Sequence, residues 1–443
     1  MPLGDPEPSK PKRTLIVTCS GGGGLLQAAT AKEQEILMAD PHAFIVRKDL
    51  LKDWVGKIFG NFCVYLWNSA QKKGDVRKQQ ALLSGQGLAD YVFFPFVFLR
   101  ALKVLFQKKI DRVIDTQPIA TLAILKAIRL YNWKTGKKIL LEKIVVDLPT
   151  KKATHFFRPI RKMSDQDRKF VRLFTIYPLL EEGQTREEFW KENCNLSESE
   201  ISYEDPYIRQ AFRAYRGKPR PQKRVELLIL YKTEEEQKAI ERVYRKGPIQ
   251  AKIFPGKLTF AVEPQDVVLT ILLGSQPAAE ATLAYVKRFV EFASSVDKRV
   301  YLFLFSSEKT LAKISAYIEN LKQYPKNFSI IPFSFQPAET LAPLFHRSNL
   351  TLTRSGGQTA MELMSVSTGE MWIHSEAKVS PKEATLSALL KGIPQWESES
   401  ALYLQKLKGA KIVTPETIQP WVGKILESDT RLEEVDQRTG STA

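Results

Sequence analysis

The sequence predicts an α/β protein built from two parallel sheets, each covered by helices on both faces. Short apolar runs alternate with helical patterns through two stretches, about 14–150 and about 267–416. Strands that are buried on both faces form continuous apolar runs, and a parallel pair needs a crossover helix between its strands. A chain of 443 residues is also long enough to bury two separate cores.

The first stretch predicts four strands, with a helix directly after the first and another after the third. The strands are "TLIVTCS" (14–20), "AFIVRKDL" (43–50), "DRVIDTQP" (111–118) and "KILLEKIVVDLPT" (138–150). Because residues 151–223 are polar and turn-rich, we expect an insertion that carries helices inside a first domain of residues 14–258. Residues 1–13 are rich in proline and charge and predict a disordered lead-in without a signal peptide.

A second domain is expected over residues 259–416, after "RVELLILY" (224–231), a helix, and a linker over residues 253–266. A final helix near 417–427 should pack back on the first domain, followed by a tail to residue 443. The strands expected in this domain are "VVLTILLGSQ" (267–276), "RVYLFLFSS" (299–307), "FSIIPFSF" (328–335), "LTLTR" (350–354), "EMWIHSE" (370–376) and "AKIVTPE" (410–416).

The formal net charge of +17 indicates an anionic partner, such as nucleic acid, a phosphorylated metabolite or an anionic membrane, although a solvated basic surface would also explain it. Three scattered cysteines, Cys19, Cys63 and Cys194, form neither a disulfide framework nor a zinc pattern. A reducing, cytoplasmic compartment is therefore expected. The longest apolar run, Tyr91 to Leu99, is too short to span a bilayer, so we expect a soluble or peripheral protein.

Three stretches combine a strand end, small residues and a helix start, a geometry that suits phosphate or a developing oxyanion. The first is Ser20 with Gly21, Gly22, Gly23 and Gly24, the second is Gly274, Ser275 and Gln276, and the third is Arg354, Ser355, Gly356 and Gly357. A tight structural turn or an ordinary serine N-cap would also explain the first two. Glu362, two turns into the third helix, could accept hydrogen bonds from the vicinal hydroxyls of a ribose, or could be a solvated helix residue.

In this order and at about this spacing, the three stretches resemble the GT-B glycosyltransferases, in which two Rossmann-like domains face each other across a cleft. "LLGSQPA" and "RSGGQTAMELM" resemble the bacterial transferase that adds N-acetylglucosamine to lipid I, and "YLQKLKGAKIV" resembles the end of its donor domain. The resemblance implies a UDP-sugar as co-substrate, with Glu362 on the ribose. It also places the sugar-contacting pair of that family approximately on Trp396 and Glu397.

The N-terminal half resembles the monogalactosyldiacylglycerol synthases through residues 48–74, "DRVIDTQP" and "VVDLPTKKATHFF". Gln117 stands where those enzymes carry a histidine, and Asp147 and His155 match their Asp-Leu and nearby histidine. Leu25 replaces the histidine that ends their glycine loop and acts at the acceptor hydroxyl, and leucine cannot take a proton. The segment from Gly369 to Trp396 is also lengthened or rearranged relative to these families.

A glycosyltransferase must remove a proton from an acceptor hydroxyl. Among the four histidines, His155 is our first candidate for the base, with Asp147 as an alternative, while His374 is expected to touch the donor. No carboxylate cluster for a divalent ion is apparent, so no metal or other cofactor is expected, and helix N-termini with Arg354 could balance the diphosphate.

Residues 91–109, "YVFFPFVFLRALKVLFQKK", combine aromatic and basic side chains, as a segment at a membrane interface does, although a core helix with a basic edge would look similar. We therefore expect a cytoplasmic, peripheral-membrane hexosyltransferase that uses a UDP-sugar and a lipid or lipid-linked acceptor on an anionic membrane, without nucleic acid. Two alternatives stay open. One is a catalytically inactive GT-B protein that binds a nucleotide sugar or a membrane, and the other is a UDP-sugar 2-epimerase.

Overall fold

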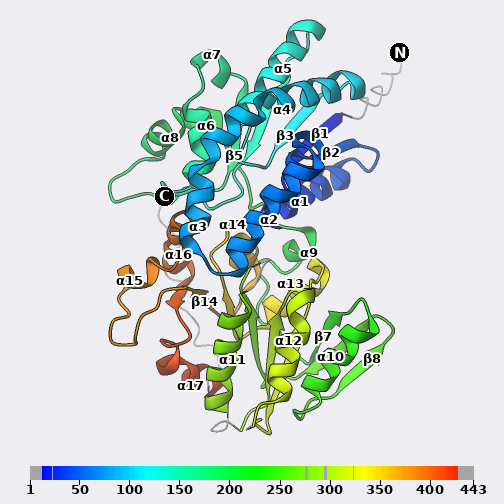
Figure 1. Cartoon of the computed structure of the whole chain (residues 1–443), viewed down its shortest axis with the longest axis vertical. Coiled ribbons are helices and arrows are strands. Elements are labelled where there is room, and N and C mark those ends of the chain that lie inside the picture. Colours follow the sequence, from blue (N-terminus) through cyan, green and yellow to red (C-terminus); the bar gives the residue numbers. More distant parts are fainter. Residues whose placement is uncertain (1–11, 22, 275–277, 294–296, 323, 428–443) are drawn as a thin grey trace, which may run out of the picture. The chain divides into compact units, whose positions relative to one another are not determined.

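The computed structural model describes residues 12–427, except for 22, 275–277, 294–296 and 323 (Figure 1). The described chain divides into two compact units. The first unit contains residues up to Ala214 together with Arg354–Ser365 and Lys391–Lys408, and the second contains Tyr215–Thr353, Val366–Leu390 and the chain from Gly409. Most of the expected lead-in and most of the expected tail lie outside the described residues.

The first unit is built on a six-stranded parallel sheet in the order β2-β1-β3-β4-β5-β6. Its strands are β1 (Arg13–Thr18), β2 (Phe44–Asp49), β3 (Arg112–Asp115), β4 (Leu141–Ile144), β5 (Val171–Thr175) and β6 (Ile201–Tyr203). The first four confirm the sequence prediction. The expectation that residues 151–223 form an insertion is wrong, because β5 and β6 lie in this range and extend the same sheet. These strands have only five and three residues, and they include the polar residues Arg172 and Ser202, so they do not stand out between polar loops.

Helices cover both faces of this sheet, and the long helix α4 runs along α5 (Figure 1). Most of these helices follow a strand, as expected for parallel crossovers. The helical segments of this part of the chain are α1 (Gly23–Ala39), a π-helical stretch (Leu50–Val55), α2 (Lys57–Lys72), α3 (Val76–Ser84), α4 (Gln86–Lys108), α5 (Thr121–Thr135), α6 (Thr154–Arg161), α7 (Asp165–Arg168), α8 (Arg186–Cys194), a 3₁₀ turn (Glu198–Glu200) and α9 (Gln210–Arg213).

The second unit contains a six-stranded parallel sheet in the order β12-β11-β10-β13-β14-β15, the order of a doubly wound Rossmann sheet. Its strands are β10 (Val267–Leu272), β11 (Val300–Phe305), β12 (Phe328–Phe333), β13 (Leu350–Thr353), β14 (Glu370–His374) and β15 (Lys411–Val413). The helices of this part of the chain are α10 (Glu234–Tyr244), α11 (Ala279–Ala293), α12 (Glu308–Glu319), α13 (Ala338–Arg347), α14 (Gly357–Val366), α15 (Leu386–Leu390), α16 (Gln395–Lys408) and α17 (Gln419–Glu427). The predicted α/β class with two parallel sheets is thereby confirmed.

A small antiparallel sheet, β7-β9-β8, belongs to the second unit and not to the first domain, where residues 225–258 were expected. Its strands are β7 (Val225–Leu230), β8 (Ala251–Phe254) and β9 (Lys257–Val262). The expected linker is in fact a hairpin, whose Gly256 adopts a φ of +77°. Gln336 fixes β7 to the second unit, because its side chain bonds both the N–H and the carbonyl of Leu230 at 2.8 Å.

Helix α17 packs on α11 within the second unit, so the expectation that the final helix packs on the first domain is wrong. Val422, Ile425 and Leu426 lie on one side of the helix and, with Ile418 just before it, are almost fully buried in the core of that unit. This apolar stripe is sufficient to hold the helix against its own sheet.

Candidate functional site

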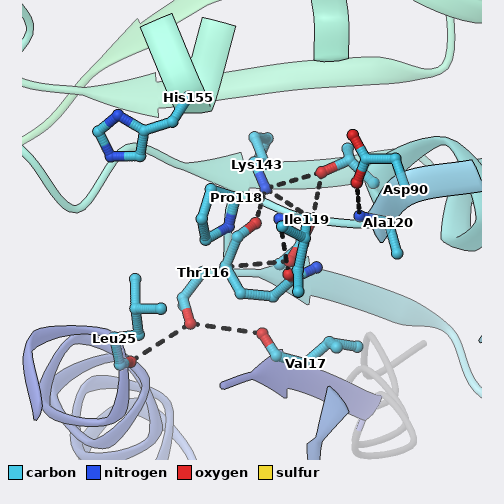
Figure 2. Close-up of polar contacts among 12 residues, drawn as sticks. Val17, Leu25, Asp90, Thr116, Pro118, Ile119, Ala120, Lys143 and His155 are labelled. Carbon is cyan, nitrogen blue, oxygen red and sulfur yellow. Dashed lines mark hydrogen bonds and ion pairs between the residues drawn. The ribbon is translucent and has the colours of Figure 1, made fainter. Parts of the chain in front are cut away.

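The strand order of the first sheet reverses at β1, whose two neighbours are β2 and β3. In open α/β sheets, ligands bind at the carboxyl ends of the strands at such a reversal. Here the loop after β1 leads into α1, and Thr116 in the loop after β3 bonds the carbonyls of Val17 and Leu25, both at 3.3 Å (Figure 2). Thr18 bonds the Leu25 carbonyl as well, at 2.9 Å. The start of α1 is therefore fixed at this edge, and the Leu25 side chain packs against the core.

A buried polar network lies beneath the loop after β3 (Figure 2). Lys143 and Asp115 are both fully buried and form an ion pair of 2.8 Å. The ammonium group also donates to the Gln117 carbonyl and to Thr121. Burial lowers the pKa of Lys143, while the charge of Asp115 opposes that shift. The same loop ends at Ala120, which holds a left-handed φ of +54° that a residue with a side chain rarely adopts.

Asp147 and His155 form a pair at the carboxyl end of β4. The Nε2 atom of His155 lies 2.8 Å from Oδ2 of Asp147. The imidazole is 7% exposed, and its Nδ1 atom is buried without a hydrogen-bond partner among the described residues. When the Nε2 proton is donated to the carboxylate, Nδ1 carries a free lone pair, which is the arrangement a general base requires.

The start of α14 packs directly on this pair within the first unit. A Cβ atom on Gly357 would lie 2.4 Å from the Cα atom of Asp147, so only glycine allows this approach. A Cβ atom on Gly24 would likewise lie 3.3 Å from the Cβ of Gln358. The structure therefore brings together the glycine loop, Asp147 and the Gly356–Gly357 turn, three features that the sequence predicted separately.

Glu397 joins the same cluster from α16. Its backbone carbonyl accepts a hydrogen bond of 2.8 Å from Ser355. Burial raises the pKa of its carboxyl group to about 7, an effect that Arg354 opposes and Asp147 reinforces. Beside it, Trp396 lies with its ring centroid 6.1 Å from that of His155 and 6.0 Å from that of Trp67 on α2. Trp67 could not be predicted as a site residue from the sequence, because an aromatic residue on a helix more often belongs to the core.

The substitution Glu397→Gln is expected to weaken the pH dependence of the unfolding free energy. The unfolded chain releases the Glu397 proton near pH 4.5, but the folded chain releases it near pH 7. The stability that the neutral acid contributes is therefore complete below pH 4.5 and is lost as the pH rises toward 7. We expect the unfolding free energy of Glu397→Gln, measured by urea titration, to fall less with pH in this window than that of the wild type. The exposed control Glu370→Gln should follow the wild type, and an unchanged slope in Glu397→Gln would contradict the assignment.

Glu362, expected to bind ribose, is 2% exposed and paired with Arg209. The Arg209 guanidinium donates to both carboxylate oxygens, at 2.8 and 2.9 Å, and Gln358 donates to one of them at 3.2 Å. The neighbouring residues Met361 and Leu363 are buried. Ribose would therefore have to share or displace Arg209, and the ribose role stays a prediction. No sequence signal pointed to Arg209, which lies 153 residues before its partner.

The remaining donor candidates lie elsewhere or outside the described residues. His374 is buried in the second unit, where Nδ1 lies 2.9 Å from the Tyr285 hydroxyl and Nε2 lies 3.3 Å from Glu376. Gly274 follows β10, and Leu272 at the end of β10 is the register partner of Thr353 at the end of β13. The two expected donor loops thus begin at neighbouring strands of one sheet. Ser275, Gln276 and Gly22 lie outside the described residues.

Several buried polar atoms of the first unit lack a hydrogen-bond partner among the described residues. Leaving such an atom unpaired costs about 1–3 kcal/mol, so each marks a place where a water molecule or a ligand atom can complete the bonding. They belong to segments that follow β1, β3 and β4 and to helices packed on those segments. These atoms are Ser20 Oγ, Trp67 Nε1, Gln71 Oε1, Gln117 Nε2, Thr150 Oγ1, His155 Nδ1 and Gln358 Oε1, and one more, Thr175 Oγ1, lies at the end of β5.

Within the described ranges, no group of three or more His, Cys, Asp or Glu side chains is placed to hold a metal ion.

No family model matches the chain, and no curated protein matches it. Solved structures do match along most of its length. MurG of Acinetobacter baumannii is 12% identical, with a TM-score of 0.46, and the match covers 94% of this chain and 91% of MurG. The glycosyltransferase SnogD from Streptomyces nogalater is also 12% identical, with a TM-score of 0.46 and coverages of 95% and 92%. The UDP-GlcNAc 2-epimerase from Methanocaldococcus jannaschii is 14% identical, with a TM-score of 0.42 and coverages of 95% and 93%.

Proposed function

We propose that this protein is a glycosyltransferase that moves a sugar from a UDP-sugar to a lipid-like acceptor at a membrane surface. The observation that carries the proposal is the Asp147–His155 pair, which lies at the carboxyl edge of the first sheet and packs against the start of α14. The same proposal is supported by the order of three segments along the chain, which are the glycine loop, the Gly274–Gln276 loop and the Arg354–Gly357 turn. The unpartnered polar atoms of the segments at this edge, whose hydrogen bonding a ligand would complete, also support it.

In the proposed reaction, the acceptor hydroxyl oxygen attacks the anomeric carbon while the bond from that carbon to the diphosphate oxygen breaks. His155 Nδ1 takes the hydroxyl proton, and Asp147 holds the ring and stabilises the imidazolium that forms. The loops that contain Ser275 and Gly356 would hold the diphosphate with Arg354, and Gly21–Gly24 would face the acceptor and the leaving group. Glu362 is proposed to bind ribose, and Glu397 and His374 to contact the donor.

Calorimetry with a panel of nucleotide sugars, followed by a UDP-release assay with liposomes, tests this proposal. UDP release that requires an acceptor supports a transferase. Release without acceptor, together with an epimerised sugar, would indicate a 2-epimerase. Binding without release would indicate a protein that has lost catalysis, a reading that Leu25 favours because its packed side chain cannot transfer a proton.

Removing the Glu362 carboxylate is expected to weaken donor binding. A ribose bound through two hydrogen bonds to a carboxylate loses both in Glu362→Ala, so we expect the Kd for the UDP-sugar to rise at least about tenfold. Isothermal titration calorimetry measures this change. The matched control is Glu370→Ala, an exposed glutamate at the start of β14. An unchanged Kd in Glu362→Ala would show that the ribose binds elsewhere.

The proposed membrane contact is the outer face of α2 and α4. Ile58, Tyr91 and Leu99 are 91%, 80% and 62% exposed, and Lys57, Arg100 and Lys103 lie on the same helices. Apolar side chains beside basic ones fit the interface of an anionic bilayer, which is the occupant we propose for this face. No helix in the described part of the chain has the length and apolarity needed to cross a bilayer.

Polar substitution of this face is expected to abolish binding to vesicles. We predict that the double variant Tyr91→Ser/Leu99→Ser no longer floats with liposomes that contain anionic lipid, because its apolar area is lost. Phe335→Ser removes a side chain of similar exposure, 58%, from the second unit and should float like the wild type. Flotation of the wild type with neutral and anionic liposomes alike, or with neither, would count against an anionic membrane.

A further inference from the structure

Helix α4 has two faces with different partners. Besides the outer side chains Leu88, Tyr91 and Leu99, it carries an inner face on which Gln86 and Asp90 lie one turn apart. Asp90 accepts a hydrogen bond from the backbone N–H of Ala120, as Figure 2 shows. The inner face of the proposed membrane helix thus contacts the loop that follows β3.

Gln86 also contacts the loop that follows β3, and in addition it contacts α6. It is 7% exposed, and its Nε2 atom donates to the carbonyls of Pro118 and His155, both at 2.8 Å. One amide group therefore joins α4, the loop after β3 and the first turn of α6. His155 is the residue that we propose as the base.

The His155 carbonyl needs this outside donor because of the sequence of α6. In an α-helix the carbonyl of residue 155 accepts from the N–H of residue 159. Residue 159 is Pro159, which lies inside α6 and has no N–H. A buried carbonyl without a donor is costly, and Gln86 supplies the missing hydrogen bond from α4.

We infer that Gln86 is a positioning residue through which α4 sets the place of His155, so that binding of the outer face of α4 to a lipid surface changes the surroundings of the imidazole. The inference rests on the proposed function, because it takes His155 as the base and α4 as the membrane helix. Its geometric basis is the pair of hydrogen bonds from one side chain to Pro118 and His155.

Histidine resonances test the positioning directly, without any assay of transfer. The chain contains only four histidines, so the imidazole ¹H–¹⁵N signals of the full-length protein can be assigned by substitution. We expect Gln86→Ala to shift the His155 signal and to leave those of His42, His346 and His374 in place. The exposed residue Gln107, near the end of α4, provides the control, and Gln107→Ala should leave all four signals unchanged.

A second substitution separates positioning from general damage. Pro159→Ala restores an N–H that can reach the His155 carbonyl from within α6. The double variant Gln86→Ala/Pro159→Ala should therefore return the His155 signal toward its wild-type position. A His155 signal that does not move in Gln86→Ala, or that the second substitution does not restore, would overturn the positioning role. A variant that fails to fold would lose the dispersion of all four signals. In that case the single variant Gln86→Lys, which keeps a donor, would test the positioning role through the same His155 signal.

Vesicles with anionic lipid test the coupling to the surface. When they bind the wild type, we expect the His155 signal to shift, and we expect the shift to be lost in Gln86→Ala although that variant still co-sediments with the vesicles. An equal shift in both proteins, or none in the bound wild type, would overturn the coupling. Failure of the wild type to bind would overturn the coupling together with the lipid part of the proposed function, while the vesicle-free spectra would still decide the positioning role. Absence of transferase activity would change neither set of spectra.

Discussion

Alanine at position 155 is expected to lower kcat for sugar transfer by about 10²–10⁴-fold, the usual effect of removing a general base. Among the described histidines, only His155 has a carboxylate partner at one ring nitrogen and a buried second nitrogen without a partner. UDP release in the presence of acceptor and liposomes measures the loss. Donor binding should change little, because the base acts on the acceptor hydroxyl.

Two further variants test whether the loss of kcat in His155→Ala comes from removal of a general base. Asp147→Asn keeps the size of the side chain but cannot stabilise an imidazolium, so it should also lower kcat while leaving the Kd of the donor nearly unchanged. His42→Ala replaces an exposed histidine after α1 and should behave as the wild type. Full activity in His155→Ala would exclude His155 and leave Asp147 as the candidate base.

Removal of the Lys143 ammonium group, beneath the loop after β3, is expected to be the most destabilising single change considered. Lys143→Met leaves the fully buried Asp115 without its ionic partner, and breaking a buried pair from one side costs about 3–5 kcal/mol of unfolding free energy. Urea denaturation followed by circular dichroism measures this cost. The exposed pair Lys411–Glu370 provides the control, and Lys411→Met should cost about 1 kcal/mol or less.

A double variant tests whether the cost comes from an unpaired charge. Lys143→Met/Asp115→Leu removes both charges and should recover part of the stability, because apolar residues can often replace a buried ion pair. Thr121 and Gln117 would still lose their bonds to the carboxylate, so recovery should be incomplete. A double variant less stable than Lys143→Met would contradict this account.

Local patterns were sufficient to predict most of the two parallel sheets. The strands β1 to β4 and β10 to β15 lie in segments rich in apolar residues, and such segments are recognisable without knowledge of their partners. The small sheet was missed because the Pro255–Gly256 turn of its hairpin looks the same as a linker. β5 and β6 were missed because pairing with the edge of a sheet, and not their own short sequences, makes them strands.

The candidate site was predictable only in part, for a similar reason. Glycine turns and the Asp147–His155 spacing are local features, and the structure brings them together. The partners of these residues come from distant parts of the chain. Nothing in one sequence links Arg209 to Glu362 or Gln86 to His155, which are 153 and 69 residues apart.

The division of the chain into two units limits where this protein can be truncated. Residues 354–365 and 391–408 belong to the first unit, although they lie between strands of the second sheet. A fragment that ends near residue 214 would therefore lack the glycine turn that packs on Asp147 and the indole that stacks on Trp67. Expression of residues 12–214 alone should therefore yield an insoluble or unfolded product.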